Sequence, residues 1–132
     1  MPGHDPLVAA ARHAREHAIA PYSGFRVGAA LQAGDGRVFT GCNVENASYG
    51  LTVCAERVAL LKALSEGVRE FSALVVVAES DTPTPPCGPC RQLLWEYCGD
   101  IPVILADLER ERGHHMLGAL LPFPFDARTL GR

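Results

Sequence analysis

Apolar positions recur along the chain at two spacings, one typical of helices and the other typical of strands. Helical spacing predicts helices over about residues 5–20, 54–67 and 88–98, and a short one within 116–125 that prolines bring to an end. Asp5 suits the N-cap of the first helix and Pro6 its first helical position, N1. In the second helix, the expected buried face carries Val58, Leu61 and Leu64.

Short apolar runs rich in β-branched residues predict strands over residues 25–33, 37–44, 71–79 and 101–107. The segment 34–36, Gly-Asp-Gly, predicts a hairpin turn between the first two strands. The third run is apolar throughout, which is typical of a strand covered on both faces. Because strands then alternate with helices, some connections must be parallel crossovers. We therefore expect an α/β fold of three layers (α/β/α), with one mixed β-sheet, an initial hairpin and helices on both faces.

The composition narrows the class of protein. The 132 residues, 48% apolar and 20% charged, suit a single globular domain over residues 1–132. The formal net charge of −3 provides no basic surface, so we expect no nucleic-acid partner. No apolar run approaches the ~20 residues that span a bilayer, so we expect no membrane association. The N-terminus lacks a basic leader followed by an apolar stretch, so we expect no secretory signal and a cytoplasmic location.

The chain has five cysteines, an odd number that argues for metal binding or catalysis rather than for disulfides. Cys87 and Cys90 stand three residues apart at a predicted helix start, so both thiols can lie on one face of the first turn. The partial positive charge of a helix start favours the thiolate. That environment serves a redox-active dithiol and half of a metal site equally well. The Cys-Gly-Pro-Cys tetrad alone therefore does not decide between them.

Cys54 opens another predicted helix and meets the same electrostatics. With Cys87 and Cys90 it can offer Zn²⁺ three sulfur ligands and leave a fourth position open for water, as catalytic zinc sites do. A closed structural site would need a fourth protein ligand, and histidines are weak candidates because they usually face water. The histidines are His4, His13 and His17, in or before the first helix, and His114 and His115, in a polar loop.

Glu56 lies two residues after Cys54 and has no place in a redox interpretation. A carboxylate there can take a proton from water on the metal and later return it to a substrate. A lone glutamate would be explained as a first-turn acid favoured by the helix dipole. Beside the three cysteines, proton transfer is the better interpretation.

Residues 54–56, Cys-Ala-Glu, and 86–92, Pro-Cys-Gly-Pro-Cys-Arg-Gln, fit the deaminase pattern Cys/His-x-Glu followed by Pro-Cys-x-x-Cys. Three further blocks match in the expected order, at residues 21–31, 41–50 and 120–125. The chain resembles the small, homotetrameric, zinc-dependent cytidine deaminases of the cytidine/deoxycytidylate deaminase family. The resemblance covers roughly residues 18 to 125 and implies a cytidine-deaminase-like fold.

The resemblance also implies an activity. Cys54, Cys87 and Cys90 would hold one Zn²⁺ per chain, and Glu56 would be the catalytic proton shuttle. The implied reaction is the hydrolytic deamination of cytidine and 2′-deoxycytidine to uridine and 2′-deoxyuridine, with release of ammonia, in pyrimidine salvage. A zinc-activated hydroxide would attack C4 of the cytosine ring.

Five residues would bind the nucleoside by the same resemblance. Asn43 and Glu45 would grip the sugar hydroxyls, although loop solvation also explains them. Phe25 would form an aromatic wall, unless it is an ordinary core residue. The backbone near Ala55 would fix the base edge, since N–H groups are exposed at helix starts. Phe125 would reach the pocket of a neighbouring subunit in the homotetramer.

Arg57 has an electrostatic interpretation. Three thiolates and one Zn²⁺ sum to −1, and an arginine hydrogen-bonded to the sulfurs would offset that excess, as in relatives with three cysteine ligands. A solvated helix arginine is the alternative. We expect Cys42 and Cys98 to be buried inert thiols, and residues 113–115 to be a surface loop.

Three rival functions remain open. A deaminase of the same fold could act on another aminopyrimidine nucleoside such as blasticidin S. A Cys-Gly-Pro-Cys thiol-disulfide oxidoreductase is less favoured, because it leaves Cys54 and Glu56 unexplained. A non-enzymatic zinc module would need a fourth ligand, and a basic surface if it bound nucleic acid.

Overall fold

The computed structural model describes residues 4–132, so the first three residues of the expected 1–132 domain lie outside the described part. The elements follow in the order α1 (Asp5–Arg15), β1 (Val27–Ala33), β2 (Val38–Cys42), the 3₁₀ helix η2 (Tyr49–Leu51), α2 (Ala55–Ser65), β3 (Phe71–Ala78), α3 (Gly88–Cys98), β4 (Pro102–Ala106), β5 (Glu111–Met116) and α4 (Leu117–Leu120).

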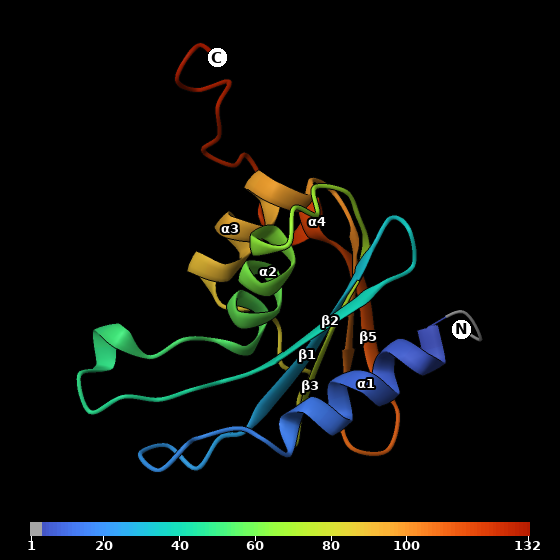
Figure 1. Cartoon of the computed structure of the whole chain (residues 1–132), viewed down its shortest axis with the longest axis vertical. Helices are drawn as coiled ribbons and strands as arrows, with labels where there is room; N and C mark the ends of the chain where they lie inside the picture. Colours follow the sequence, from blue (N-terminus) through green and yellow to red (C-terminus); the bar gives the residue numbers. More distant parts are fainter. Residues whose placement is uncertain (1–3) are drawn as a thin grey trace.

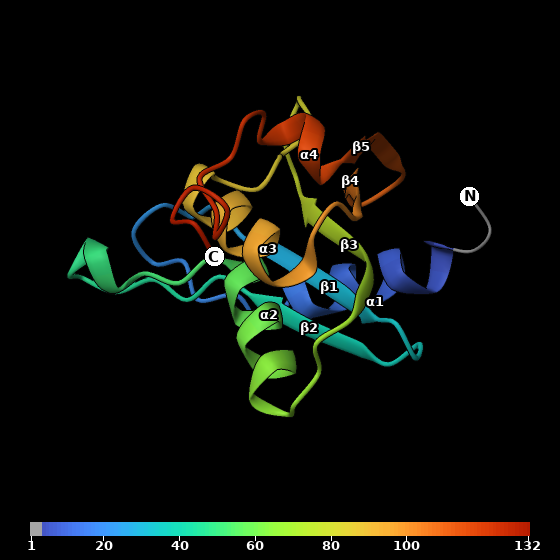
Figure 2. The same cartoon turned by 90° about the horizontal axis from the view of Figure 1, so that it is seen from above.

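The five strands form one sheet in the order β2-β1-β3-β4-β5. Strands β3 and β4 are parallel, and the other neighbours are antiparallel. Helix α1 covers one face, while α2, α3 and α4 cover the other, and α2 and α3 lie side by side (Figures 1 and 2). The expected α/β/α arrangement, with its initial hairpin and mixed sheet, is confirmed.

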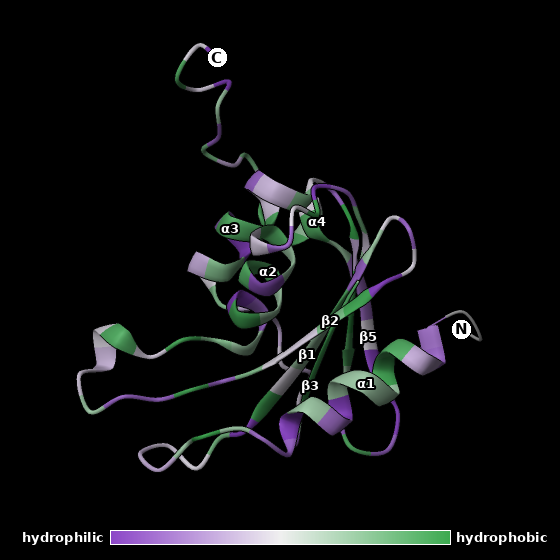
Figure 3. Cartoon of the chain, in the orientation of Figure 1, coloured by the Kyte–Doolittle hydropathy of each residue, from purple (hydrophilic) through white to green (hydrophobic). Residues whose placement is uncertain are grey.

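Alternate residues of the central strands belong to two separate hydrophobic cores, one on each face of the sheet. On β3, Leu74 and Val76 pack with α2 and α3, whereas Val75 and Val77 pack with α1. All four side chains are at most 1% exposed. A strand buried on both faces must be apolar at every position, and β3 is apolar along most of its length in Figure 3.

Strand β5 corrects the expectation that residues 113–115 form a surface loop. It pairs antiparallel with β4, with His114 opposite Ile104 and His115 opposite Val103. As an edge strand it has polar, largely exposed side chains, so it lacks the apolar alternation that reveals a strand in a sequence.

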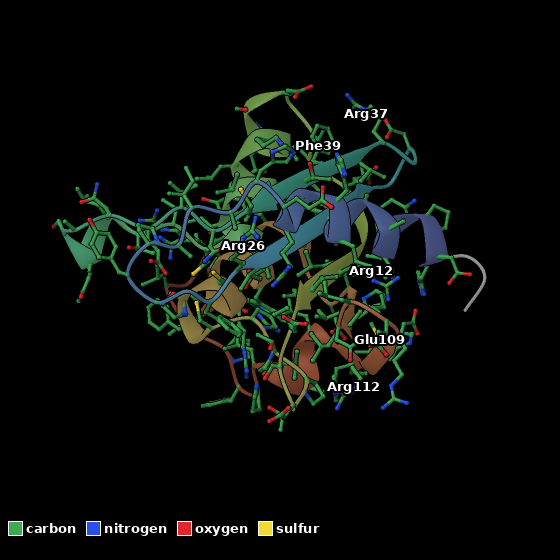
Figure 4. All side chains as sticks on the ribbon, turned by 90° about the horizontal axis from the view of Figure 1, so that it is seen from below. Arg12, Arg26, Arg37, Phe39, Glu109 and Arg112 are labelled. Atoms are coloured by element: carbon green, nitrogen blue, oxygen red, sulfur yellow. The ribbon has the colours of Figure 1, made fainter. Side chains whose placement is uncertain are left out.

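The turn before β5 is held by Asp107. Its carboxylate accepts hydrogen bonds from the backbone of Glu109 and Arg110 and from the Arg112 guanidinium, each at 2.8 Å. These bonds, led by the backbone bond from Arg110, hold the pKa of Asp107 well below its usual range. Arg12 of α1 donates to the Asp107 carbonyl at 3.0 Å, and Figure 4 shows Arg12, Glu109 and Arg112 gathered at this end of the sheet.

Helix α1 is shorter than expected, because it ends at Arg15 rather than near residue 20, and its N-cap is His4 rather than Asp5. The residues that follow it join other backbone. Ile19 donates to the carbonyl of Asn43 and accepts from Glu45, both at 2.9 Å. A helix cannot keep residues whose backbone groups are paired with a distant segment.

The buried face of α2 also differs from the expected one. Ala55, Ala59, Leu60 and Ala63 are fully buried, whereas Leu61 is 50% exposed. Small side chains face the sheet because α2 lies unusually close to β2. A Cβ atom added at Gly41 would lie 2.3 Å from the carbonyl oxygen of Ala55, so larger residues would not fit there.

No helix within residues 4–132 is long and apolar enough to cross a membrane.

We predict that Gly41→Ala destabilises the protein, because the added methyl group would also lie 2.7 Å from the backbone nitrogen of Ala59. Overpacking of this kind costs about 1–3 kcal/mol. Urea unfolding followed by circular dichroism measures the loss. Gly50→Ala is the control, since a Cβ there meets nothing within 4 Å. Equal stability of the two variants would contradict the close packing of α2 on β2.

Candidate active site

Three cysteine thiols meet at one point of the structure. The sulfur atoms of Cys54, Cys87 and Cys90 all lie within 4.8 Å of one another, and this is the one group of potential metal ligands found in residues 4–132. The Cys54 and Cys87 sulfurs are 3.6 Å apart. Tetrahedral zinc with Zn–S bonds of about 2.3 Å needs sulfurs about 3.8 Å apart. The donor set and its spacing therefore fit Zn²⁺.

Two helix starts bring the thiols together. Cys54 is the N-cap of α2 and Cys87 is the N-cap of α3, while Cys90 lies in the first turn of α3 and is 1% exposed. The positive ends of both helix dipoles therefore point toward the sulfurs. Hydrogen bonds, first from Cys90 and then from Cys87, help lower the pKa of Cys54 to about 6. The pKa of Cys90 is raised, because it shares its proton with Cys54 and is buried.

Glu56 is buried beside the thiols, with only 4% of its surface exposed. Burial, followed by the charge of Cys54, raises its pKa to about 7. A first-turn acid stabilised only by the helix dipole would face water and would have a lowered pKa. Glu56 instead can hold or release a proton near neutral pH, as a proton shuttle requires.

A cavity of about 290 Å³ connects these groups to the other candidate residues. Cys54, Glu56 and Cys87 line it together with Asn43 and Glu45. Phe25 and Ala55 also line it, as do Thr84 and Pro85 from the segment before α3. A larger cavity of about 520 Å³, between residues 79–81 and 107–112, is lined mainly by charged side chains and includes none of the cysteines. The residue types that line the smaller cavity, rather than the volume of the cavity, therefore identify it as the candidate active site.

Asn43 and Glu45 are tied to the segment that precedes β1. Asn43 is 8% exposed; its Oδ1 accepts from the Val27 N–H and its Nδ2 donates to the Phe25 carbonyl, both at 2.8 Å. Glu45 accepts hydrogen bonds from residues 22 and 23. Loop solvation does not explain such a buried and bonded asparagine. Phe25 is 40% exposed and faces the cavity, so it is not a core residue.

Ser23 is a cavity residue that the sequence reasoning missed. Its hydroxyl donates to Glu45, at a short distance, and accepts from the Phe25 N–H at 3.0 Å. The available signal was a serine two residues before Phe25 in a turn-forming segment, where serine commonly bonds nearby backbone.

Phe125 does not line the cavity of its own chain. It is 59% exposed and lies in the C-terminal tail, which leaves the body of the protein beyond α4 (Figure 1). Helix α3 holds this tail: Gln92 donates to the Phe125 carbonyl at 2.5 Å, and Trp95 donates to the Asp126 carboxylate at 3.1 Å.

Arg57 lies near the thiols, and one of its hydrogen-bond donors has no partner. Its Nε is buried and has no hydrogen-bond acceptor, while its charge helps lower the pKa of Cys54. A buried guanidinium N–H left unpaired is costly. The free Nε–H of Arg57 is therefore available to donate a hydrogen bond to a thiolate of the neighbouring cluster.

The remaining cysteines and the histidines lie outside the sulfur cluster. Burial raises the pKa of the Cys98 thiol to about 12, which suits an inert thiol, although Cys98 and Cys42 are only half-buried. His13, His17, His114 and His115 are exposed, as expected, whereas His4 is partly buried. A closed site with a histidine as fourth ligand is therefore not supported.

An α/β fold that brings three thiols together, two of them in the wall of a cavity that a buried glutamate also lines, defines a zinc-dependent hydrolase site. The family model described as "Cytidine and deoxycytidylate deaminase zinc-binding region" matches residues 1–105. The chain belongs to this family, and zinc is its cofactor.

Several proteins of similar sequence or structure are named cytidine deaminases. The chain is 48% identical over 127 residues to the cytidine deaminase of Sporosarcina psychrophila, covering 96% of this chain and 93% of the relative. It is 50% identical over 125 residues to that of Halalkalibacterium halodurans, covering 94% and 95%. The crystal structure of cytidine deaminase from Burkholderia pseudomallei superposes with a TM-score of 0.88 at 51% identity, covering 92% of this chain and 98% of that chain. A blasticidin-S deaminase from Bacillus cereus is 32% identical over 87 residues, covering 60% of this chain and 62% of the relative.

We predict that the purified protein contains about one zinc ion per chain and that Cys90→Ser loses most of it, because a hydroxyl is a poor replacement for a thiolate ligand. Inductively coupled plasma mass spectrometry measures the content. Cys42→Ser is the matched control and keeps its zinc, since Cys42 lies outside the cluster. Full zinc content in Cys90→Ser would show that the cluster is not the metal site.

Proposed function

We propose that this protein catalyses the hydrolytic deamination of cytidine and 2′-deoxycytidine to uridine and 2′-deoxyuridine, with release of ammonia. The observation that carries the proposal is the burial of Glu56 in the same cavity as Cys54 and Cys87. A structural zinc site does not require a buried carboxylate with a pKa near 7, whereas a hydrolytic site does. The cytidine deaminases of similar sequence, at 48% and 50% identity, support the choice of substrate.

Cys54, Cys87 and Cys90 would hold the metal. Zinc, when bound there, acts as a Lewis acid that makes water a strong nucleophile near neutral pH. Cys54 is prepared for this role because its lowered pKa favours the thiolate before metal arrives. Three thiolates carry one negative charge more than Zn²⁺ neutralises, and the guanidinium of Arg57 would offset it through its unpaired Nε–H.

Glu56 would move the protons. It takes one from the water that attacks C4 of the cytosine ring and gives it to ring N3. It then takes the second proton from the hydroxyl group now attached to C4 and delivers it to the leaving amino group, so that the C4 carbonyl forms, ammonia departs and Glu56 returns to its starting state. Glu56 is only 4% exposed and Ala55 before it is fully buried, which keeps the carboxylate away from bulk water. A pKa near the working pH lets one carboxylate serve as both base and acid.

The rest of the cavity would hold the nucleoside. Asn43 still has one N–H and one lone pair free of protein bonds, so it can donate to and accept from a sugar hydroxyl. Glu45 would accept from the same sugar. Phe25 would pack against the nucleoside, and the backbone at Ala55 would meet the base edge at the α2 start.

We further propose a homotetramer in which each pocket receives Phe125 from a neighbouring chain. Phe125 is 59% exposed, and Phe123 beside it is completely exposed. Two aromatic residues on a projecting tail are costly to leave in water. Tyr49 and Leu51 of η2, at 76% and 66% exposure, offer further apolar surface for contacts between chains.

The proposal includes a single domain over residues 1–132 that serves pyrimidine salvage in the cytoplasm. The five cysteines are all free thiols, which suits a reducing compartment. Blasticidin S remains the alternative substrate, supported by a match that covers 60% of this chain. A thiol-disulfide oxidoreductase is disfavoured, because Cys87 and Cys90 share their cluster with Cys54.

We predict that the protein releases ammonia and uridine from cytidine in equal amounts and that Glu56→Gln reduces kcat by about 10²–10⁴-fold, because glutamine cannot carry a proton. A coupled ammonia assay and chromatography of the nucleosides give the rates. The variant keeps its zinc, since Glu56 is not among the clustered ligands. A Glu56→Gln enzyme with wild-type turnover would refute the shuttle.

We predict that sedimentation velocity at low micromolar concentration gives the mass of four chains, and that Phe125→Ala lowers kcat/KM about 3- to 10-fold through lost stacking. Hybrids test the sharing of pockets. Phe125→Ala chains mixed with Glu56→Gln chains regain activity, because the second chain supplies the missing ring to a pocket with an intact Glu56. A monomer, or hybrids without recovery, would contradict the shared pocket.

A further inference from the structure

Ser23 lies in the segment between α1 and β1 and lines the same cavity as Cys54 and Cys87. Its Oγ makes two hydrogen bonds of opposite direction. It accepts the Phe25 N–H at 3.0 Å, and it donates to Oε2 of Glu45 at a short distance. The Phe25 N–H can only donate and the Glu45 carboxylate can only accept. The hydroxyl proton of Ser23 therefore points to the carboxylate.

The same segment occupies the other carboxylate oxygen. The backbone N–H groups of Tyr22 and Ser23 donate to Oε1 of Glu45 at 2.9 Å and 3.1 Å. Together with the Ser23 hydroxyl, Glu45 therefore receives three donors from two consecutive residues. A carboxylate offers about four lone-pair sites, so about one remains for a ligand. These bonds, led by that of the Ser23 hydroxyl, lower the pKa of Glu45 and keep it an acceptor.

Asn43 is fixed independently of Ser23. Its amide is buried and bonded to the Phe25 carbonyl and the Val27 N–H. Glu45 is only half-buried, and the bonds from residues 22 and 23 are the ones that hold its carboxylate. Loss of the Ser23 hydroxyl would therefore free one oxygen of Glu45 while Asn43 stayed in place.

We propose that Ser23 is a positioning residue that turns Glu45 so that its remaining lone pair meets a sugar hydroxyl, and that Ser23 thereby sets a preference for nucleosides whose sugar carries hydroxyl groups. This inference rests on the proposed function, since it concerns the sugar end of the same site. Ser23 acts through Glu45 and takes no part in proton transfer at the base.

The test compares two substrates that differ only at the sugar. Ser23→Ala lowers kcat/KM for cytidine by about 3- to 30-fold, chiefly through KM, as expected for one hydrogen bond to a charged group. For 2′,3′-dideoxycytidine, which has no hydroxyl for Glu45 to bind, the same variant changes kcat/KM less than about twofold. Zinc content stays at the wild-type value.

Two variants serve as controls. Ser23→Thr keeps a hydroxyl at the same position and restores most of the preference for cytidine. Ser65→Ala removes a serine hydroxyl that donates to the Lys62 carbonyl at the far end of α2 and leaves both substrates unaffected. Equal losses on cytidine and the dideoxy compound would mean that Ser23 only orders the segment around Phe25, and would overturn the proposal. An unchanged Ser23→Ala enzyme would overturn it as well.

Equilibrium binding separates this inference from the proposed reaction. Calorimetry with uridine and 2′,3′-dideoxyuridine reports the sugar preference without turnover. If the wild-type protein does not deaminate cytidine, the proposed reaction is wrong. A preference for uridine that Ser23→Ala reduces would still support the role of Ser23, and no preference for uridine would overturn it.

Discussion

Three thiolates repel one another, so they can stay close together only where positive charge offsets theirs. Cys54 and Cys87 each begin a helix, and the two helix starts converge. The dipoles of α2 and α3 therefore add at one point, and Arg57 contributes a full charge beside it. The metal site depends on this convergence, and Glu56, in the first turn of α2, is buried beside it. The close approach of α2 to β2 at Gly41 is what fixes one of the two helices.

Burial has different consequences for the polar residues of the site. Glu56 is buried without enough donors to stabilise its charge, so its pKa rises to about 7 and the group becomes useful for moving protons. Asn43 is buried with its amide bonded on both sides, which fixes the orientation of its side chain. Glu45 is more exposed and rich in donors, so its pKa is lowered and it stays an acceptor. The two glutamates thus differ in pKa only because their surroundings differ.

The substrate side of the cavity is also part of the scaffold. The hydrogen bonds of Asn43 and Glu45 close the segment 22–27 onto the residues that follow β2. Ile19 joins the same pairing through its own backbone. The two residues proposed to bind the sugar are therefore also the residues that hold this wall of the cavity in place. Helix α3 combines roles in the same way, since it begins at a metal-ligand candidate and holds the tail that carries Phe125.

The sequence by itself determined the elements whose signals are local. The apolar run of β3, the Gly-Asp-Gly hairpin and the helix starts at Cys54 and Cys87 are all found where the pattern of residues predicts them. The three cysteines together with Glu56 also indicated a catalytic zinc site, because few other arrangements use those residue types together. Local periodicity and residue chemistry are enough for such features, because they do not depend on distant parts of the chain.

Only the tertiary structure decided the rest. Strand β5 exists because β4 offers an edge to pair with, and its own polar residues carry no strand pattern. Helix α1 ends early because Ile19 bonds to backbone beyond residue 42, and α2 turns its alanines inward because Gly41 lies beneath them. The hydrogen-bonded link from Phe25 through Ser23 to Glu45 joins segments about 20 residues apart. Contacts of this kind are set by packing between distant segments, which no local pattern of residues encodes.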